Sequence, residues 1–414
     1  MSRPTIANLS IFQALGLLVS AGGGSLVWFA AATLARPADL GALGRVASTS
    51  ALVAGLVTAG LGQFLLTIIR SSPTARVRAY LWMSILAGAM LSALVAGCVG
   101  AWQSGRLDLA ALATGLLAGG IAVTNIQDAL YLGVGLARDV PAKGAAIVLA
   151  RLVLLACALV ALDLTSLLLA FVISQLGVAL GWLAVRGPGA FQRHQPLLGE
   201  QLAHSGARGT LAFSYLYSIS AAAILTGVPA LVTSLAPPER AGAFFLAWTV
   251  AGVLSGISVA VANSVLAVAP DADDPVRQLA RVLVVVVAGL CAAGALVAFV
   301  LPDLLVLFSP RYRSMTDQLA MLAAGQIAFG GAIVSLAVYR ALSRDRYLIA
   351  VLVAWPLLVV GGVALGLRES GVDGGATGFM AGNLIAAVAI CPLAFRVALA
   401  YGRGLAGLPA EVMR

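Results

Sequence analysis

The sequence predicts an all-α polytopic membrane protein with about twelve transmembrane helices in two like-oriented six-helix bundles around a central cavity. Three observations lead to this prediction. Of the 414 residues, 61% are hydrophobic and only 10% are charged, whereas soluble chains carry about 25% charged residues. Apolar runs long enough to cross a bilayer recur along the chain, and its longest polar loop divides them into two sets of six.

The apolar runs define the predicted helices. A transmembrane helix needs about 20 predominantly apolar residues, and we expect helices because backbone polar groups in lipid must be satisfied within each segment. The predicted spans cover residues 9–34, 46–69, 79–101, 109–134, 144–162, 166–186, 209–235, 243–269, 280–301, 315–339, 347–367 and 376–400.

The basic residues predict the orientation. The net charge of +9 arises from 24 arginines and Lys143 against 16 acids. If the N-terminus is cytoplasmic, seventeen basic residues, Lys143 among them, fall in or beside cytoplasmic loops and seven on the outer side. This bias follows the positive-inside rule. We therefore expect a multi-pass protein of the cell (inner, plasma) membrane with both termini cytoplasmic, and no nucleic-acid partner.

The central polar loop predicts the domain organisation. Residues 1–186 form an N-terminal six-helix bundle, residues 187–208 a cytoplasmic linker loop, and residues 209–414 a C-terminal six-helix bundle. Because each half has an even number of helices, both enter the membrane in the same direction, and their symmetry axis is expected to lie along the membrane normal.

A weak internal repeat supports two duplicated halves. The loop around Pro37 and Gly41 follows the first helix, and the loop around Pro238 and Gly242 follows the seventh, 201 residues later. Duplicated bundles of this kind enclose a site near the membrane midplane and transport by rocking around it. The sequence therefore indicates a transporter.

Short elements also carry a resemblance to a known family. The segments 37–41 and 238–242 resemble its P-x-x-x-G turn. The segment 302–312 resembles its P-x-L-L-x-L-F-G-x-x-Y element, with Ser309 in place of the glycine, and the segment 371–378 resembles its G-I-x-G-A-A element. The chain thus resembles the polysaccharide-transport branch of the multidrug/oligosaccharidyl-lipid/polysaccharide exporter superfamily, which includes flippases of O-antigen and other lipid-linked oligosaccharides.

The resemblance implies a function and partners. A flippase of this branch moves an undecaprenyl-pyrophosphate-linked oligosaccharide, a polysaccharide precursor, from the inner to the outer leaflet by alternating access. The implied partners are the lipid-linked glycan, membrane lipids, and the glycan polymerase or glycosyltransferases of the same pathway. No cofactor is implied.

Two other functions stay open. An ion-coupled multidrug or cation antiporter of the same superfamily needs membrane carboxylates, and Asp128 is the only clearly deep acid. A membrane glycan polymerase typically carries a large extracellular loop or a dedicated catalytic His or Asp, whereas the predicted outer loops here are short. We expect no enzyme, because the sequence holds no metal-ligand cluster, no phosphate-binding loop and no nucleophile–base arrangement.

Arg151 is the strongest candidate for a site residue because it is a charged residue inside the predicted fifth helix. A charge at that depth costs about 2.5–3.5 kcal/mol on insertion scales. Asp128 lies at a similar distance from the expected helix connection at 139–140, so we expect the two to meet. Either they form a buried ion pair that fixes helix packing, or Arg151 binds a pyrophosphate while Asp128 orients it, since guanidinium matches phosphate with two parallel hydrogen bonds.

Further candidates complete the predicted site. Arg45, Gln63 and Gln175 are expected to contact the substrate. Gly22, Gly23 and Gly24 in the first helix, and Gly227 and Pro229 in the seventh, are expected to act as hinges, because glycine loosens a helix and proline removes a backbone hydrogen bond. The four cysteines are interpreted as small core residues without disulfides.

Overall fold

The computed structural model describes residues 6–59, 61, 74–134, 136, 138–157, 163–193, 207–268, 288–300, 315–342 and 347–402. All regular elements in these residues are helices. By close packing they form two compact units, Gly23–Leu246 and Met1–Gly22 with Ala247–Arg414. Each unit is described by itself.

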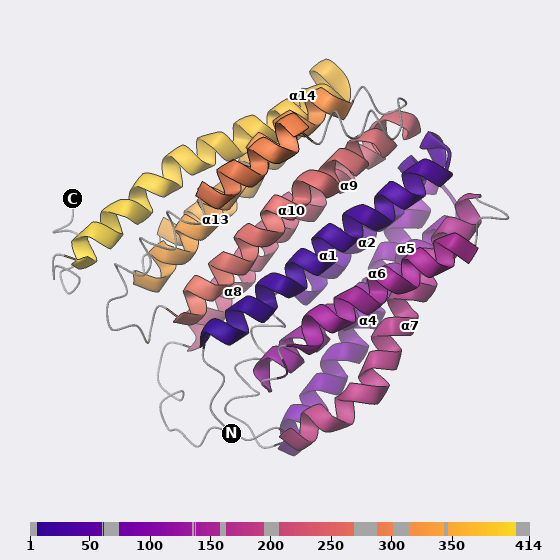
Figure 1. The fold of residues 1–414 in the computed structure, drawn as a ribbon, viewed down its shortest axis with the longest axis horizontal. Helices are drawn as coiled ribbons and strands as arrows, with labels where there is room; N and C mark the ends of the chain where they lie inside the picture. The colour runs from indigo at the N-terminus through magenta and orange to yellow at the C-terminus, as the bar shows by residue number, and fades with distance from the viewer. Residues whose placement is uncertain are drawn as a thin grey trace. The chain divides into compact units, whose positions relative to one another are not determined.

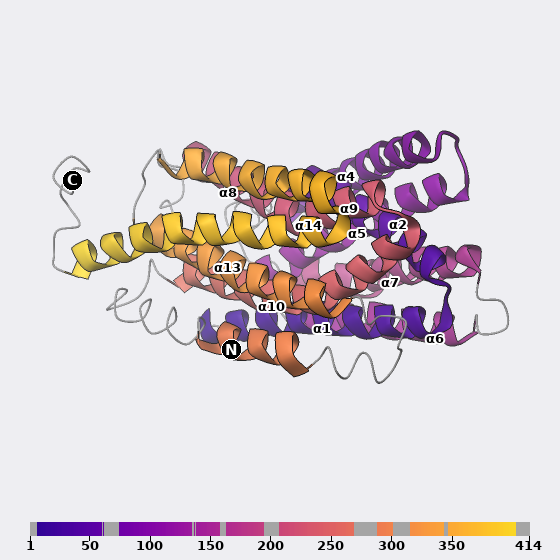
Figure 2. The same ribbon diagram turned by 90° about the horizontal axis from the view of Figure 1, so that it is seen from above.

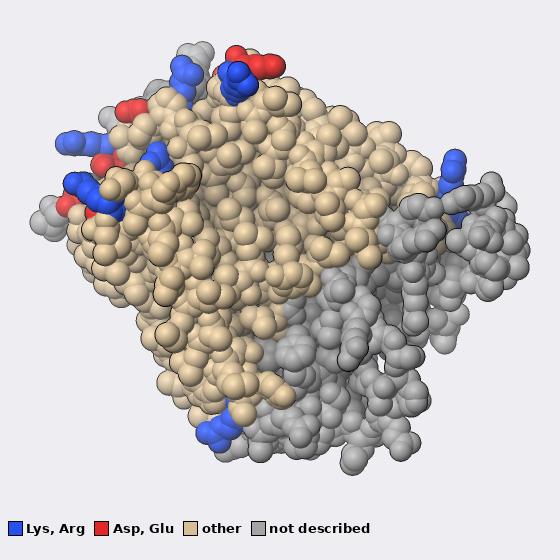
Figure 3. All heavy atoms as spheres, turned by 180° about the vertical axis from the view of Figure 1, so that it is seen from behind, with Lys and Arg blue, Asp and Glu red and all other residues tan. Residues whose placement is uncertain are grey.

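The helices have the length and the surface of membrane-spanning helices. In the described residues, nine helices are long and apolar enough to cross a membrane, and shorter apolar helices lie at Gly22–Leu34 and Ala288–Phe299. Large apolar side chains face outward; Met90 is 68% exposed and Val388 is 74% exposed. On the face drawn in Figure 3, a wide area of the described surface carries no charged side chain. The predicted all-helical polytopic fold is confirmed.

The unit Gly23–Leu246 is built around α5, which packs against α2, α4 and α7. Figure 1 shows α6 and α7 beside α5. Its elements are the second part of α1 (Ile6–Leu34), α2 (Pro37–Thr58), α4 (Thr74–Ser104), α5 (Leu109–Gly133), α6 (Asp139–Cys157), α7 (Leu164–Arg193), α8 (Ala207–Ala222), the π-helical turn η3 (Ala223–Gly227), α9 (Val228–Leu235) and the start of α10 (Pro238–Val268).

Capping residues set several helix starts in this unit. The carboxylate of Asp108 accepts a hydrogen bond from the backbone N–H of Ala111 at 2.9 Å, and the carboxylate of Asp163 accepts one from the backbone N–H of Ser166 at 2.9 Å. These bonds satisfy backbone donors that the first helical turn leaves free. The bonds from Ser166 also hold the pKa of Asp163 below its usual range.

The unit that contains Ala247–Arg414 includes the rest of α10, the π-helical turn η5 (Leu296–Val300), α13 (Met315–Leu342) and α14 (Tyr347–Gly402). Figure 2 shows α13 alongside α14, and the two are in close contact. The chain reverses inside α14 at Gly371, which has φ 66° and ψ −144°, a conformation that glycine adopts without strain.

Glycines let the two arms of α14 approach each other. A Cβ on Gly374 would collide with the carbonyl oxygen of Gly366, and a Cβ on Gly378 with that of Gly362. Small residues of this kind allow membrane helices to pack backbone to backbone. The glycine element at 371–378 therefore forms a tight helical hairpin. The element at 302–312 lies outside the described residues.

Several predictions need correction, and the largest shift is at α2, which begins at Pro37, nine residues before the predicted span 46–69. Helix α6 begins at Asp139, five residues before the predicted span, so Lys143 lies in a helix instead of a loop. Helix α7 continues to Arg193, past the predicted start of the linker at residue 187. Cysteines 98, 157 and 291 are exposed and do not belong to the core. The predicted division into two halves stays a prediction.

The repeat is visible in the backbone of the two matching loops. Helix α1 ends at Leu34 and α2 begins at Pro37; α9 ends at Leu235 and α10 begins at Pro238. The hydrogen bond from Leu40 N–H to Arg36 O has its counterpart, 201 residues later, in the bond from Ala241 N–H to Pro237 O. The same offset relates the bonds of Ala35 N–H to Ala31 O and of Ala236 N–H to Val232 O. The two loops therefore share one backbone structure.

The two loops also interlock reciprocally. A Cβ on Gly41 would collide with the carbonyl oxygen of Pro238, and a Cβ on Gly242 would lie 2.7 Å from the carbonyl oxygen of Pro37. Each glycine thus packs on the proline of the other loop, as a local twofold axis requires. We call the contact of Pro37–Gly41 with Pro238–Gly242 the glycine junction. Hydrogen bonds beside it join Ser48 to Thr233 at 3.0 Å and Gln103 to Ser234 at 3.0 Å.

The glycine junction should not tolerate a larger residue. We expect Gly41→Ala to lower the stability of the folded protein by about 1–3 kcal/mol, because overpacking forces the backbones apart. The measurement is the thermal unfolding midpoint of the purified protein in detergent. The control is Gly181→Ala on α7, where a Cβ meets nothing within 4 Å. Equal midpoints for both variants would contradict the close approach.

Candidate functional site

The predicted pair of Arg151 and Asp128 is wrong, and Asp128 pairs with Lys143 instead. Lys143 Nζ lies 2.8 Å from Asp128 Oδ1. The reason is the early start of α6. The connection between α5 and α6 spans residues 134–138, so its centre is near residue 136, and the residue at the depth of Asp128 is close to 143 instead of 151.

Lys143 is held by three oxygen atoms. Besides the carboxylate of Asp128, its ammonium donates to the backbone carbonyl oxygen of Thr124 at 2.8 Å and to Gln127 Oε1 at 3.4 Å. The lysine side chain is only 2% exposed. Two hydrogen bonds and one ion pair therefore surround the ammonium group. We call these three oxygens the Lys143 cage.

Arg151 lies farther along α6, about 12 Å from Lys143 at 1.5 Å per residue. Its Nε donates to Ser174 Oγ at 3.1 Å and its Nη2 donates to Gln175 Oε1 at 2.5 Å, both on α7. Its guanidinium carbon lies 4.8 Å from the centre of the Phe171 ring, within cation–π range. Among the described residues no carboxylate pairs with Arg151, so neutral groups alone hold this charge.

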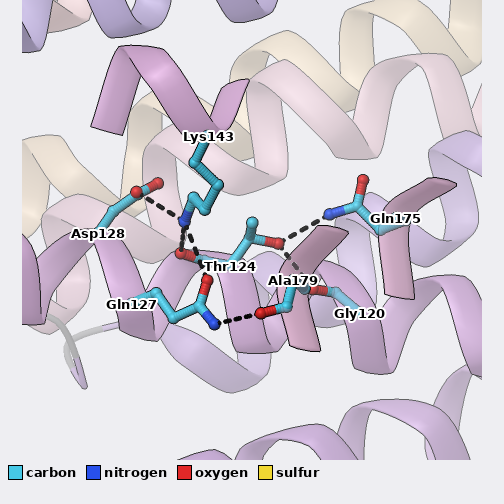
Figure 4. A network of polar contacts seen from close by, with 7 residues as sticks. All are labelled: Gly120, Thr124, Gln127, Asp128, Lys143, Gln175 and Ala179. Atoms are coloured by element: carbon cyan, nitrogen blue, oxygen red, sulfur yellow. Dashed lines mark hydrogen bonds and ion pairs between the residues drawn. The ribbon is translucent and has the colours of Figure 1, made fainter. Parts of the chain in front are cut away.

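One chain of hydrogen bonds joins the two cations, and Figure 4 shows the part of it around Lys143. Gln175 Nε2 donates to Thr124 Oγ1 at 2.7 Å, and the carbonyl oxygen of Thr124 accepts from Lys143. Gln127 Nε2 donates to the carbonyl oxygen of Ala179 at 2.7 Å. Side chains from α5, α6 and α7 therefore form a single polar network that contains two cations and one anion, and it carries a net positive charge.

A second ion pair lies where α6 begins. Arg186 Nε of α7 is 3.7 Å from Asp139 Oδ1, and the arginine is 56% exposed. Its guanidinium carbon lies 6.0 Å from the centre of the Trp182 ring. Exposed pairs of this kind contribute little to stability. This pair neutralises Asp139 and leaves the positive charge of the network unchanged.

The other predicted contact residues lie in different places. Gln175 belongs to the network. Arg45 donates from Nε to the carbonyl oxygen of Thr233 at 2.9 Å, which places it beside the glycine junction, far along the chain from Arg151. Gln63 lies outside the described residues. Which of these residues touch a substrate stays a prediction.

The predicted hinges differ in their local structure. Helix α1 runs through Gly22–Gly24 without interruption, although the boundary between the two compact units falls between Gly22 and Gly23. The seventh helix changes to a π-helical turn at Ala223–Gly227, immediately before Pro229. Proline lacks an N–H for the helical ladder, and a π-helical turn often marks a functional site in a helix. The hinge role of all five residues stays a prediction.

The sequence did not identify Lys143, Thr124, Gln127 and Ser174 as members of the site. The signal for Lys143 was present, because it is the only lysine in the chain and it stands beside an apolar run. Its position four residues after a helix start was hidden because the charged segment before it resembles a loop. Polar residues such as Thr124 and Gln127 give no signal that distinguishes a network from ordinary helix contacts.

Comparisons with known proteins identify the fold. No family model and no curated protein matches the sequence. Solved structures do match. An outward-facing conformation of a multidrug resistance MATE family transporter of the MOP (multidrug/oligosaccharidyl-lipid/polysaccharide) superfamily is 14% identical, with a TM-score of 0.62 over 96% of this chain and 97% of that chain. An inward-facing conformation of such a transporter is 16% identical, with a TM-score of 0.57 over 97% of this chain and 96% of that chain.

A third match differs in the polarity of its binding pocket. It is a MOP superfamily transporter from Pyrococcus furiosus Vc1 (DSM3638), for which reverse polarity of the binding pocket suggests a different function; it is 15% identical, with a TM-score of 0.61 over 96% of both chains. At these identities the likeness concerns the fold alone. The chain has the fold of the MOP superfamily membrane transporters, as the sequence predicts at that level.

Gln175 links the two parts of the network, because it forms hydrogen bonds with both Arg151 and Thr124. We expect Gln175→Leu to lower the stability by about 1–3 kcal/mol, because Arg151 Nη2 loses its buried acceptor and Thr124 loses one of its hydrogen bonds. The thermal unfolding midpoint of the purified protein measures this. The control is Thr165→Val, an exposed change on the same helix, which should shift the midpoint little. An unchanged midpoint for Gln175→Leu would show that the network contributes nothing to stability.

Proposed function

We propose that the chain is a membrane transporter that moves an undecaprenyl-pyrophosphate-linked oligosaccharide from the inner to the outer leaflet by alternating access. The observation that carries the proposal is Arg151, a cation inside a membrane span held only by neutral partners in the described part of the chain. Intramembrane charges are costly and mark substrate pathways. A guanidinium without a carboxylate partner favours an anionic ligand, and its planar fork can donate two parallel hydrogen bonds to phosphate oxygens.

The glycine junction fits alternating access. It joins the loop after the first helix to the loop after the seventh helix, so it would hold together one end of the two proposed halves. Fold neighbours exist in both outward-facing and inward-facing conformations. A transporter of this type would open the junction when the substrate leaves on that side. The π-helical turn at Ala223–Gly227 lies in the seventh helix, where such a movement would bend the chain.

A second candidate is an ion-coupled multidrug or cation antiporter, which the description of one fold neighbour as a multidrug resistance transporter favours. Two charges argue against it. Asp128, the deep carboxylate expected to take a coupling ion, is already paired with Lys143. An organic cation near Arg151 would meet a like charge. We therefore place the proposed substrate among anionic lipids.

The proposed substrate contact predicts a loss of transport. We expect Arg151→Gln to reduce surface glycan at least tenfold in a strain from which the wild-type gene is deleted, because a charge-assisted phosphate contact is worth about 1.5–3 kcal/mol. Arg151→Lys should retain part of the transport, since it keeps the charge without the planar fork. Surface polysaccharide is measured by immunoblot, and the amount of membrane-inserted protein is measured in parallel.

Two further variants control this experiment. Arg368→Ala removes an exposed arginine and should export normally. Gln175→Glu gives Arg151 a carboxylate partner, so it should preserve or raise the unfolding midpoint while it lowers export. Normal export by Arg151→Gln, or export by Gln175→Glu at the wild-type level, would refute the assignment.

A further inference from the structure

The Lys143 cage has the chemistry of a cation site. Its three oxygens come from the carboxylate of Asp128, the side-chain amide of Gln127 and the backbone carbonyl of Thr124. Carboxylate and carbonyl oxygens are the donors that hard metal cations prefer. In this chain the position among them is filled by the ammonium of Lys143, which is covalently tethered to α6.

The tethered ammonium already occupies the cage. Two of the oxygens accept hydrogen bonds from it and the third forms an ion pair with it, and the lysine side chain is 2% exposed. A free cation could enter only by displacing a group that is bound to the same chain, so its effective concentration is far above that of any dissolved ion. Because the carboxylate already has its counter-charge, it gains nothing from a second cation.

We propose that Lys143 is a built-in counter-cation, and that its ammonium occupies a monovalent-cation site which becomes available to Na⁺ when the ammonium is removed. In the native chain Asp128 therefore binds no dissolved Na⁺. For the proposed transporter, on whose function this consequence rests, Asp128 does not couple transport to a sodium gradient.

The three oxygens of the cage all belong to residues of α5. The side chain of Asp128 is 34% exposed although that of Lys143 is buried. Removal of the lysine side chain beyond Cβ leaves the three oxygens in place on α5, whose backbone positions Thr124, Gln127 and Asp128 within one and a half turns.

The test is a sodium-binding measurement on the full-length protein purified in detergent at pH 8 with choline as the only other cation. Binding of ²²Na⁺ is followed by scintillation proximity. We expect no saturable binding by the wild type, one saturable Na⁺ per chain for Lys143→Ala, and at least a tenfold loss of that binding when Asp128→Asn is added. No glycan is present, so the result does not depend on the identity of the transported lipid.

Two outcomes would overturn the proposal. One is saturable binding of Na⁺ by the wild type that Asp128→Asn removes, since the carboxylate would then be an open site. The other is a folded Lys143→Ala protein that binds no Na⁺. If Lys143→Ala does not fold, Lys143→Ser takes its place, because its side chain is also short enough to leave the cage empty.

A third arm covers the case in which neither single variant can be purified. The double variant Asp128→Asn with Lys143→Met removes both charges and leaves no unneutralised carboxylate. Recovery of the double variant when both single variants are lost supports the proposal, because it shows that the ammonium is needed as the counter-charge of Asp128. Loss of the double variant as well would contradict it.

Discussion

The positive charge of Arg151 inside a helix that crosses the membrane is the constraint on which the rest of the site depends. A charge at such depth costs several kcal/mol unless the surrounding protein compensates it. The structure compensates it with the hydroxyl of Ser174, the amide of Gln175 and the face of Phe171. These groups solvate the guanidinium without neutralising it, so its field stays available to an anion. A carboxylate at the same place would have given a stable helix pair and an inert charge.

Lys143 shows the opposite solution on the same helix. Its ammonium is surrounded by three oxygens, one of them from a carboxylate, so its charge is balanced within the protein. The two cations are joined through Thr124 and Gln175. The charge of Lys143 is therefore balanced by a carboxylate, whereas the charge of Arg151 is not. The presence or absence of a counter-charge distinguishes a packing role from a binding role better than depth in the membrane does.

Packed aromatic rings connect the open half of the network to the glycine junction. Phe171, which covers Arg151, lies 5.1 Å from Trp28 between ring centres, and Trp28 lies 4.5 Å from Phe245. Phe245 in turn packs against Gly44, its counterpart in the repeat at an offset of 201 residues. In the proposed transporter this row of contacts gives a physical route by which a ligand at Arg151 can influence the packing of the junction.

The sequence could predict most of the fold because the determining signal is simple. Apolar length specifies a membrane span regardless of its neighbours, and the recurrence of proline and glycine 201 residues apart specified matching turns that the structure contains. The site was harder to predict because a partner depends on helix register. The connection between α5 and α6 lies a few residues earlier than predicted. Lys143 therefore lies at the depth of Asp128, and Arg151 contacts Ser174 and Gln175 on α7. Neutral partners of this kind carry no signal in one sequence, because they resemble every other polar residue in a helix.

The central claim is that an unneutralised guanidinium selects an anionic lipid, and direct binding of a defined lipid tests it most closely. Native mass spectrometry of the purified protein can compare undecaprenyl pyrophosphate with the uncharged alcohol undecaprenol. The account predicts that the pyrophosphate binds at least tenfold more tightly than the alcohol, and that Arg151→Gln abolishes this preference. Equal binding of the two lipids by the wild type, or an undiminished preference in the variant, would contradict it.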